Sequence, residues 1–314
     1  MSGTRRRWLD AFGLGLAVRD LTVRLDPVPA ADEKVTARGF AESGGGPVPT
    51  ALVTLARLGR RCAFAGVVGT DDAGAFIEQD LRREAIDTSC LLRRDDAGSA
   101  TSVILVEPGG ARRVCEWGQK DLPFSAGDLR SALPLLDDCE FLLIDARLPE
   151  AQREAAARVR RRGGRVVLDC GHPRPGVEPL LQVTDVAIFS HSYPRSLHGE
   201  RFDAERFVGW LRERLAPGGP RIAGLTLGRA GCLIARPGGA VTRVPGLPVH
   251  AVDTTGAGDV FHGAFVHRLL DGASATDAAR FANAAAALSC RQLTARAPLP
   301  DAAAIRRFAA TGRA

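Results

Sequence analysis

The sequence predicts an α/β fold, with a mostly parallel central sheet between two helical layers and a small second sheet beside it. Short apolar runs alternate along the chain with amphipathic or Ala-rich segments, as in successive strand–helix units. The runs 141–144 and 166–168 are apolar on both faces, which is typical of central strands in a parallel sheet. Two further regions contain strand patterns without helices, and these predict the second sheet.

The strands and helices along the chain are predicted from their local patterns. Apolar runs predict strands over Ala11–Leu16, Cys62–Val68, Ser102–Val106, Phe141–Ile144, Arg165–Asp169, Val186–Phe189, Ile222–Thr226 and Cys232–Ala235. Amphipathic or Ala-rich segments predict helices over Thr50–Leu58, Ala73–Glu84, Glu150–Arg162, Asp203–Leu215, Asp259–Leu270 and Ser274–Cys290.

The second sheet is expected from segments of about 18–40 and 99–117. Both show short strand patterns with turns and have no helix of their own. Pro108-Gly109-Gly110 predicts a hairpin between the strands 101–106 and 113–117. No linker is long enough to divide the chain, so we expect residues 1–314 to form one domain with this sheet inserted in it.

The composition is that of a globular protein, because 45% of the 314 residues are hydrophobic and 25% are charged. The net charge of +6 comes mostly from arginines that are scattered among acidic residues. This pattern, with only 5% aromatic residues, argues against a nucleic-acid partner.

The cysteines and the apolar runs indicate the expected location. The seven cysteines form no C-x-x-C pair, which argues against a zinc site or a disulfide framework. No signal peptide and no run of 18 apolar residues is present. We therefore expect a cytoplasmic protein with reduced cysteines and no membrane partner.

The segment 249–270 carries the clearest chemical signal. An extended stretch ends at Asp253, and Thr254-Thr255-Gly256-Ala257-Gly258-Asp259 leads directly into an amphipathic helix. The first N–H groups of such a helix are free, and its dipole is positive there, so the turn predicts an anion-binding cup. It is not a Walker A loop, because no Gly-Lys-Ser/Thr follows.

Asp259 has two interpretations on this local pattern. A carboxylate in an anion cup suits an enzyme that transfers a phosphoryl group, since it can take a proton from the attacking hydroxyl. Aspartate is equally common as a cap at the start of a helix. The local residues leave these two interpretations balanced.

The ordered set of motifs resembles the ribokinase-like (PfkB) carbohydrate kinases over nearly the whole chain. Residues 252–261, VDTTGAGDVF, resemble the family's C-terminal signature, and Gly44-Gly45-Gly46-Pro47 its N-terminal Gly-Gly signature. The segments 66–74, 226–232 and 281–288 resemble further family motifs in the same order. The resemblance implies a ribokinase-like three-layer sandwich and ATP-dependent phosphorylation of a small sugar or sugar derivative.

The resemblance also implies roles for individual residues. Asp259 would be the general base, and the backbone of Gly256, Ala257 and Gly258 would form the anion hole. The sugar would be bound by Asp20, Gly44 and Gly45, and the nucleotide by Thr226, Gly228, Gly231 and Asn283. Family members use Mg²⁺ with ATP and some respond to K⁺; Asp253 is a candidate metal ligand. The small sheet would cover the sugar as a lid and form a homodimer surface.

Two departures from the family pattern concern the substrate pocket. The usual Asn of the N-terminal signature is replaced by Pro49, and the usual N-x-x-E by Ser190-His191-Ser192-Tyr193. With the DVFHGA segment, these departures resemble the sulfofructose kinase branch, which implies an anionic ketose.

Arg147 and Lys34 are the cations predicted to bind such an anion. Arg147 follows a buried strand, and a guanidinium suits a sulfonate, phosphate or carboxylate. Lys34 lies on the expected lid. Glu116, on the second lid hairpin, is expected near the same place and would instead favour a neutral or amino-bearing substrate, so the substrate charge stays open.

Three alternatives differ in function. Gly13-Leu14-Gly15 suggests a dinucleotide-dependent oxidoreductase, but Val18 replaces the third glycine and no helix pattern follows. A non-catalytic sugar-binding or regulatory protein is suggested by the lost N-x-x-E. A nucleoside kinase would need aromatic platforms, for which the lid offers Phe40 and Trp117.

Overall fold

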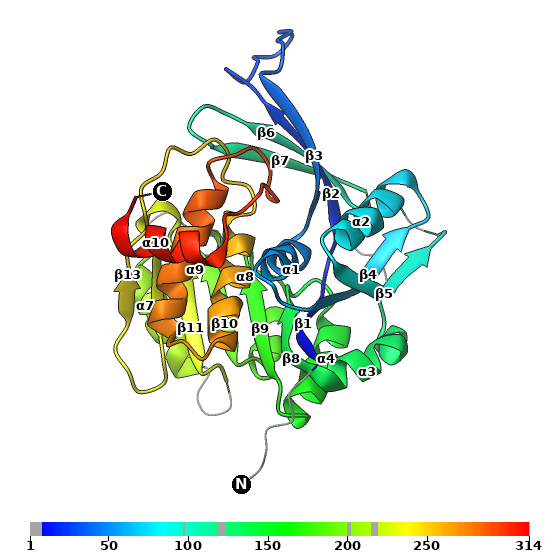
Figure 1. The fold of residues 1–314 in the computed structure, drawn as a ribbon, viewed down its shortest axis with the longest axis vertical. Helices are drawn as coiled ribbons and strands as arrows, with labels where there is room; N and C mark the ends of the chain where they lie inside the picture. Colours follow the sequence, from blue (N-terminus) through cyan, green and yellow to red (C-terminus); the bar gives the residue numbers. More distant parts are fainter. Residues whose placement is uncertain (1–7, 97, 119–123, 200–201, 215–218, 314) are drawn as a thin grey trace.

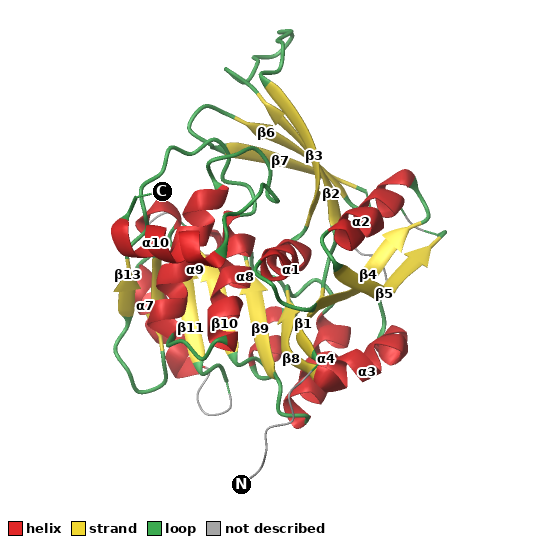
Figure 2. Ribbon diagram, viewed as in Figure 1, coloured by secondary structure: helices red, strands yellow, loops and turns green. Residues whose placement is uncertain are grey.

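Within the described residues, nine strands form the central sheet, in the order β13-β12-β11-β10-β9-β8-β1-β4-β5 (Figures 1 and 2). The computed structural model describes residues 8–313 except 97, 119–123, 200–201 and 215–218. The strands are β1 (Leu9–Leu14), β4 (Cys62–Gly69), β5 (Ile86–Arg94), β8 (Cys139–Ile144), β9 (Arg165–Cys170), β10 (Val186–Ser190), β11 (Ile222–Thr226), β12 (Cys232–Ala235) and β13 (Thr242–Val244). All neighbours are parallel except at β12, which is antiparallel to β11 and β13. The prediction of a mostly parallel sheet is confirmed.

Helices cover both faces of this sheet (Figure 2). One apolar core joins the sheet to α1 (Pro47–Arg57), α2 (Asp72–Arg83), α8 (Ala257–Leu270), α9 (Ala275–Ser289) and α10 (Ala302–Thr311). A second core joins the other face to α3 (Leu133–Asp138), α4 (Pro149–Arg161), α5 (Val177–Leu181), α6 (Ser192–His198) and α7 (Ala204–Arg214). The predicted three layers are therefore present.

A second sheet of four strands, in the order β3-β2-β6-β7, stands beside the first, and we call it the lid (Figure 1). Its strands are β2 (Val18–Arg24), β3 (Gly39–Gly45), β6 (Thr101–Val106) and β7 (Arg112–Trp117). The antiparallel pairing of β6 with β7 confirms the predicted hairpin. β3 extends past Phe40, because Gly44 and Gly45 pair with Arg19 and Val18 in the ladder rather than forming a loop.

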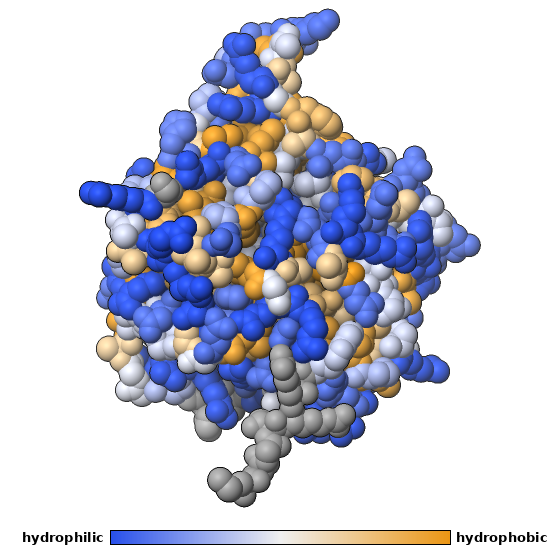
Figure 3. All heavy atoms as spheres, viewed as in Figure 1, coloured by the Kyte–Doolittle hydropathy of each residue, from blue (hydrophilic) through white to orange (hydrophobic). Residues whose placement is uncertain are grey.

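The two faces of the lid differ in composition. Residues directly opposite on paired strands share a face, so the register places Asp20, Ser43, Ser102 and Glu116 together on what we call the inner face. The alternate residues form the outer face, where Phe40 is 65% exposed and Trp117 78% exposed. Figure 3 shows apolar atoms on this part of the molecule, below the polar loop at its tip.

The pattern analysis missed several elements. β5, β13 and the helices α3, α5, α6 and α10 were not predicted. β5 is an edge strand whose buried residues alternate with polar ones, and the unpredicted helices are 5 to 10 residues long. Among the described residues, none of the helices combines the length and apolar character needed to cross a membrane.

Candidate active site

The Gly-rich segment forms the turn into α8. Gly256 precedes the helix with a φ of 69°, a left-handed conformation that favours glycine. A Cβ at Gly256 would lie 2.5 Å from the Cβ of Ala295, whereas a Cβ at Gly258 would meet nothing within 4 Å. The first turn of α8 is therefore packed on one side and open on the other. Its free N–H groups and positive dipole suit an incoming phosphate, so the site fits the ATP that the resemblance implies.

Asp259 lies in this first turn and is not the helix cap. The cap position is held by Gly256, and no side chain forms a capping hydrogen bond there. Burial and the negative charge of Asp169 raise the pKa of Asp259 to about 7, against the opposing effects of His262, Arg112 and Arg296. A carboxyl group with a pKa near neutral suits proton transfer at physiological pH.

Asp20 faces the same space from the inner face of the lid. Its side chain is 6% exposed and hydrogen-bonds to that of Ser102. Burial raises the pKa of Asp20 to about 7; Arg296 lowers it, and the negative charges of Asp259 and Asp253 raise it. The Asp259 carboxylate is thus near enough to act electrostatically on Asp20, although the two side chains come from α8 and β2.

Gly44 and Gly45 lie at the end of β3, close to Asp20. A Cβ at Gly45 would lie 2.5 Å from the Cγ of Asp20, and one at Gly44 would lie 2.7 Å from the Cζ of Arg296. The space of both missing side chains is thus filled by the protein itself. Glycine is therefore required at both positions for packing within the protein. The sequence had indicated only a contact with the sugar.

The lid contacts the signature segment directly. Gly110, in the turn between β6 and β7, forms a parallel bridge with Asp253. Its carbonyl accepts hydrogen bonds from the backbone N–H of Thr254 at 3.2 Å and from its hydroxyl at 2.7 Å. Arg112, the first residue of β7, donates to the same hydroxyl at 2.9 Å. The lid therefore covers the chain just before the anion hole.

Asp253, the candidate metal ligand, is used to hold this loop. One of its oxygens accepts from the N–H and hydroxyl of Thr255 at 2.8 and 2.6 Å, and the other from the N–H of Thr294 at 2.9 Å. No group of three His, Cys, Asp or Glu residues that could hold a metal occurs in the described part of the chain. The residues fit a Mg²⁺ that is held mainly by nucleotide phosphates and water, as this ion commonly is.

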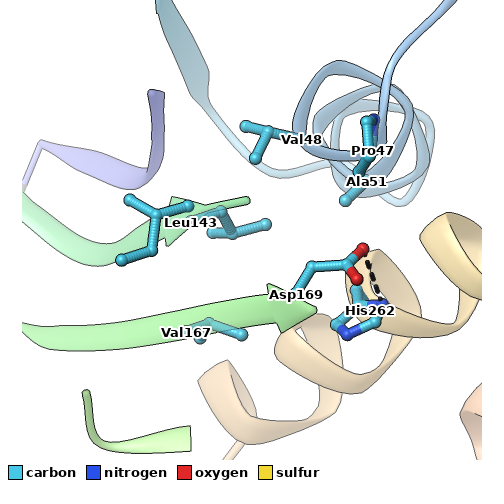
Figure 4. Close-up of a pocket in the computed structure, with 8 residues that line it drawn as sticks. Pro47, Val48, Ala51, Leu143, Val167, Asp169 and His262 are labelled. Atoms are coloured by element: carbon cyan, nitrogen blue, oxygen red, sulfur yellow. Dashed lines mark ion pairs between the residues drawn. The ribbon is translucent and has the colours of Figure 1, made fainter. Parts of the chain in front are cut away.

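Asp169 and His262 form a second polar group behind the anion hole (Figure 4). The His262 Nδ1 atom lies 3.2 Å from the Asp169 carboxylate and 2.8 Å from the carbonyl of Gly258. Burial and Asp145 raise the pKa of Asp169 to about 8, and burial lowers the pKa of His262. Both side chains border a small hollow of about 180 Å³ that is otherwise apolar, lined by Pro47, Val48, Ala51, Leu143, Ile144 and Val167. Sequence analysis missed this pair, although Asp169 ends an apolar strand.

Arg147 follows β8 and forms an ion pair with Glu116 of β7, with 3.7 Å between the Nη2 and Oε1 atoms. The expectation that these two residues lie together is met. Arg174 lies near Arg147. Burial and then the charge of Arg147 lower the pKa of Arg174. His172 lies in the loop after β9, and its partial burial, followed by the charges of Arg174 and Arg147, lowers its pKa.

The residues assigned to the nucleotide lie at the end of β11, in the turn that follows it and in α9. The Thr226 hydroxyl, at the end of β11, donates to the carbonyl of Phe189 at 3.4 Å. Gly228 and Gly231 both have positive φ; a Cβ at Gly228 would meet open space. The Asn283 amide donates to the carbonyls of Val244 and Pro245 at 3.2 and 3.1 Å, so this group supports the loop after β13.

Three other predicted positions have local roles. Lys34 is exposed in the loop that joins the far ends of β2 and β3, and is not brought to Asp20 and Asp259. The Ser190 hydroxyl donates to the carbonyl of Gly171 at 2.9 Å. Tyr193 packs edge-on against Phe189, with 4.7 Å between ring centroids. Ser190 and Tyr193, which stand where the family has the Asn and Glu of N-x-x-E, therefore make contacts within the protein.

This arrangement defines a class of protein. An open helix N-terminus with a carboxylate in its first turn, and a second buried carboxylate on the neighbouring small sheet, is suited to phosphoryl transfer onto a hydroxyl. Gly13-Leu14-Gly15 leads into the strand β2 rather than a helix, which removes the basis of the dinucleotide interpretation.

Comparison with known proteins gives the family. The model of the pfkB family carbohydrate kinases matches residues 12–302, so the chain belongs to this family of ATP-dependent kinases. It is 26% identical to a ribokinase of Haemophilus influenzae over 85% of this chain and 88% of that protein. It is 27% identical to an ATP-dependent ribose-1-phosphate kinase of Halopiger xanaduensis, over 91% and 93%. A putative ribokinase of Agrobacterium tumefaciens has the same ribokinase-like fold, with a TM-score of 0.84, 26% identity and coverage of 96% and 97%.

Proposed function

We propose that this kinase phosphorylates a hydroxyl of a small sugar or sugar derivative bound between Asp20 and Asp259. The observation that carries the proposal is a pair of buried carboxyl groups, one on the lid and one in the first turn of α8, each with a pKa raised to about 7 and with Asp259 acting electrostatically on Asp20. Residues 1–314 act as one kinase domain, with the lid over the sugar.

The chain's own residues divide the work. Asp20 accepts hydrogen bonds from sugar hydroxyls, and Asp259 takes the proton of the attacking hydroxyl. The N–H groups of Gly256, Ala257 and Gly258, with the helix dipole, stabilise charge on the transferring phosphoryl group. ATP, held along Thr226, Gly228 and Gly231, would donate its γ-phosphoryl group and leave as ADP, and a Mg²⁺ ion held by its phosphates would offset their negative charge. Asn283 would contribute to the nucleotide site by holding the backbone at 244–245, to whose carbonyls its amide donates.

The assigned base is tested by Asp259→Asn in an ADP-release assay with Mg²⁺, ATP and a sugar panel. A missing general base is expected to lower kcat roughly 10²–10⁴-fold, while the circular dichroism spectrum and ATP affinity change little. An Asn variant that turns over at the wild-type rate would show that another group takes the proton. Repeating the wild-type assay in Na⁺ and in K⁺ tests the expected potassium response.

An anionic substrate is the finer part of the proposal. Burial and then the charge of Arg147 lower the pKa of Arg174, so a second cation lies near Arg147, and Glu116 forms an ion pair with Arg147. An anion on the sugar would replace Glu116 as the partner of Arg147. This supports a phosphorylated, carboxylated or sulfonated sugar, as in the sulfofructose kinase branch. One relative is named a ribose-1-phosphate kinase.

The substrate charge is tested with D-ribose, D-fructose, ribose 1-phosphate and sulfofructose. Arg147→Ala is expected to raise KM for an anionic substrate roughly tenfold or more, since charged hydrogen bonds contribute about 1.5–3 kcal/mol, and to leave KM for a neutral sugar unchanged. Arg153→Ala, on the exposed side of α4, serves as the matched control. Unchanged KM values for every anionic sugar would remove the anion from the proposal.

The outer face of the lid supports the homodimer. Exposed apolar patches of this kind commonly mark protein interfaces. Phe40 and Trp117 share this face and point away from Asp20, so they form no platform for a nucleoside base. Their position therefore favours a sugar over a nucleoside and suits a second copy of this chain.

A further inference from the structure

Arg296 is a buried cation at the centre of the protein that no sequence motif indicates. It lies after α9, and its side chain is 4% exposed. Its guanidinium binds the Asp80 carboxylate of α2, donates from Nη2 to the carbonyl of Gly45 at 3.0 Å, and reaches the Thr50 hydroxyl of α1 at 3.4 Å. All three of its nitrogens are thus engaged, as a buried charge requires.

The segment 294–296 also contacts the anion hole. Thr294 binds Asp253 through its N–H, and Ala295 occupies the space next to Gly256. Thr294 has a φ of 91°, which is strained for a β-branched residue. The segment is therefore wedged between the anion-hole glycine and the Gly44–Gly45 strand end.

Arg296 also acts electrostatically on Asp20 and Asp259. Arg296 opposes the effects of burial and of the Asp259 and Asp253 charges on Asp20. At Asp259, Arg296, Arg112 and His262 oppose burial and the charge of Asp169. Asp80, Asp20 and Glu84 are in turn the carboxylates that act on Arg296.

We propose that Arg296 is a positioning residue of the kinase reaction: it holds the Gly45 carbonyl beside Asp20 and places one buried positive charge near both Asp20 and Asp259. This inference rests on the proposed function of the two aspartates. The segment 294–296 places the Arg296 side chain so that its charge acts on both the proposed sugar-binding residue, Asp20, and the proposed base, Asp259. Asp80 limits the effect, because it neutralises part of the same charge.

The inference predicts opposite effects for the two partners of one ion pair. Removing the cation disfavours the charged form of a nearby carboxyl group, so Arg296→Met should raise the pKa of Asp20 and Asp259. Asp80→Asn leaves the cation less neutralised and should lower both pKa values. A purely structural ion pair would lose stability in both variants without opposite shifts.

The test is a ¹³C NMR titration of protein labelled at the aspartate carboxyl carbons, without sugar or nucleotide, with Asp20→Asn and Asp259→Asn for assignment. We expect midpoints about half a pH unit or more higher in Arg296→Met, and lower in Asp80→Asn. If Arg296→Met does not fold, Arg296→Met/Asp80→Asn removes both charges and should still show the higher midpoints, since Arg296 acts directly on both aspartates. Arg296→Lys should keep midpoints near wild type.

Arg57→Met is the matched control. Arg57 donates to the carbonyls of Arg296 and Ala297 at 2.9 and 2.8 Å, so its loss loosens the same segment while Arg296 keeps its charge. It should lower the melting temperature without moving either midpoint. Shifts in the same direction in Arg296→Met and Asp80→Asn, no shifts, or equal shifts in Arg57→Met would overturn the inference. If the midpoints move as expected but no sugar is phosphorylated, the proposed function fails instead.

Discussion

The central sheet and the lid are both β-sheets of this kinase, but they are covered differently. Helices pack on both faces of the central sheet, where residues such as Phe12 and Phe64 are fully buried. The lid has an inner face toward the site and an outer face on which Phe40 and Trp117 are exposed. Asp259 is therefore carried by a helix packed on the sheet that is covered on both faces, whereas Asp20 is carried by the sheet that is covered on one face.

The largest expected effect is on stability, in a matched pair of Phe→Ala variants. Phe64→Ala in β4 should lower the free energy of unfolding by roughly 3–5 kcal/mol, because it leaves a cavity in a packed core. Phe40→Ala on the lid should change it by less than about 0.5 kcal/mol. Urea unfolding of the monomeric protein measures both values. Similar losses in the two variants would contradict the difference in packing.

The next effect concerns pH. Asp169, at the end of β9, has a folded pKa of about 8, above an unfolded value of about 4. Between these values the folded state retains a proton that the unfolded state releases, so stability falls as the pH rises. Asp169→Asn should therefore be more stable than wild type at pH 7, by about 1–3 kcal/mol, and similar at pH 4.

Thermal unfolding at both pH values checks this second prediction. Asp20→Asn should show the same direction, because the pKa of Asp20 is raised to about 7. Asp96 is the control: its hydrogen bond with Arg94 holds its pKa below the usual value, so Asp96→Asn should gain nothing at pH 7. An equal gain for Asp169→Asn at pH 4 and pH 7 would mean that charge is not the cause.

The smallest expected change in monomer stability is at Trp117. Trp117→Ser on the outer face should alter the unfolding free energy by less than about 0.5 kcal/mol, yet it should convert a lid-mediated dimer into monomers. Analytical ultracentrifugation measures the mass. Leu197→Ser, at an exposed position on α6, is the control and should leave the mass unchanged. A Trp117→Ser protein that stays dimeric would place the interface elsewhere.

Local pattern was sufficient for most of the fold. Apolar runs such as 62–68 and 141–144 correspond to buried strands, because a strand that is covered on both faces must be apolar on both. β5 was not predicted because it lies at the sheet edge, where only alternate residues are buried. The extension of β3 through Gly44 and Gly45 was missed because glycine in sequence indicates a loop, whereas here it admits the side chains of Arg296 and Asp20.

The site was predictable where one segment carries it and unpredictable where distant segments meet. Gly256 to Asp259 are contiguous, so their turn could be recognised. Arg296 and Asp80 are 216 residues apart, and neither stands in a pattern that indicates the other. Asp169 had a usable signal, since ligands of open α/β sheets bind at the carboxyl ends of strands.

The chain passes between the two sheets at four places, so the lid strands could be exchanged between relatives as a unit. It crosses at residues 15–17, at Gly46, at 95–100 and at 118–125, part of which lies outside the described residues. Replacement of the strands between these short joints would exchange Asp20 and Glu116 while leaving the nucleotide half untouched. If the lid holds the sugar as proposed, chimeras that carry a relative's lid on this sheet should change the acceptor preference, with Gly110 and Arg112 retained to keep the contacts with Thr254.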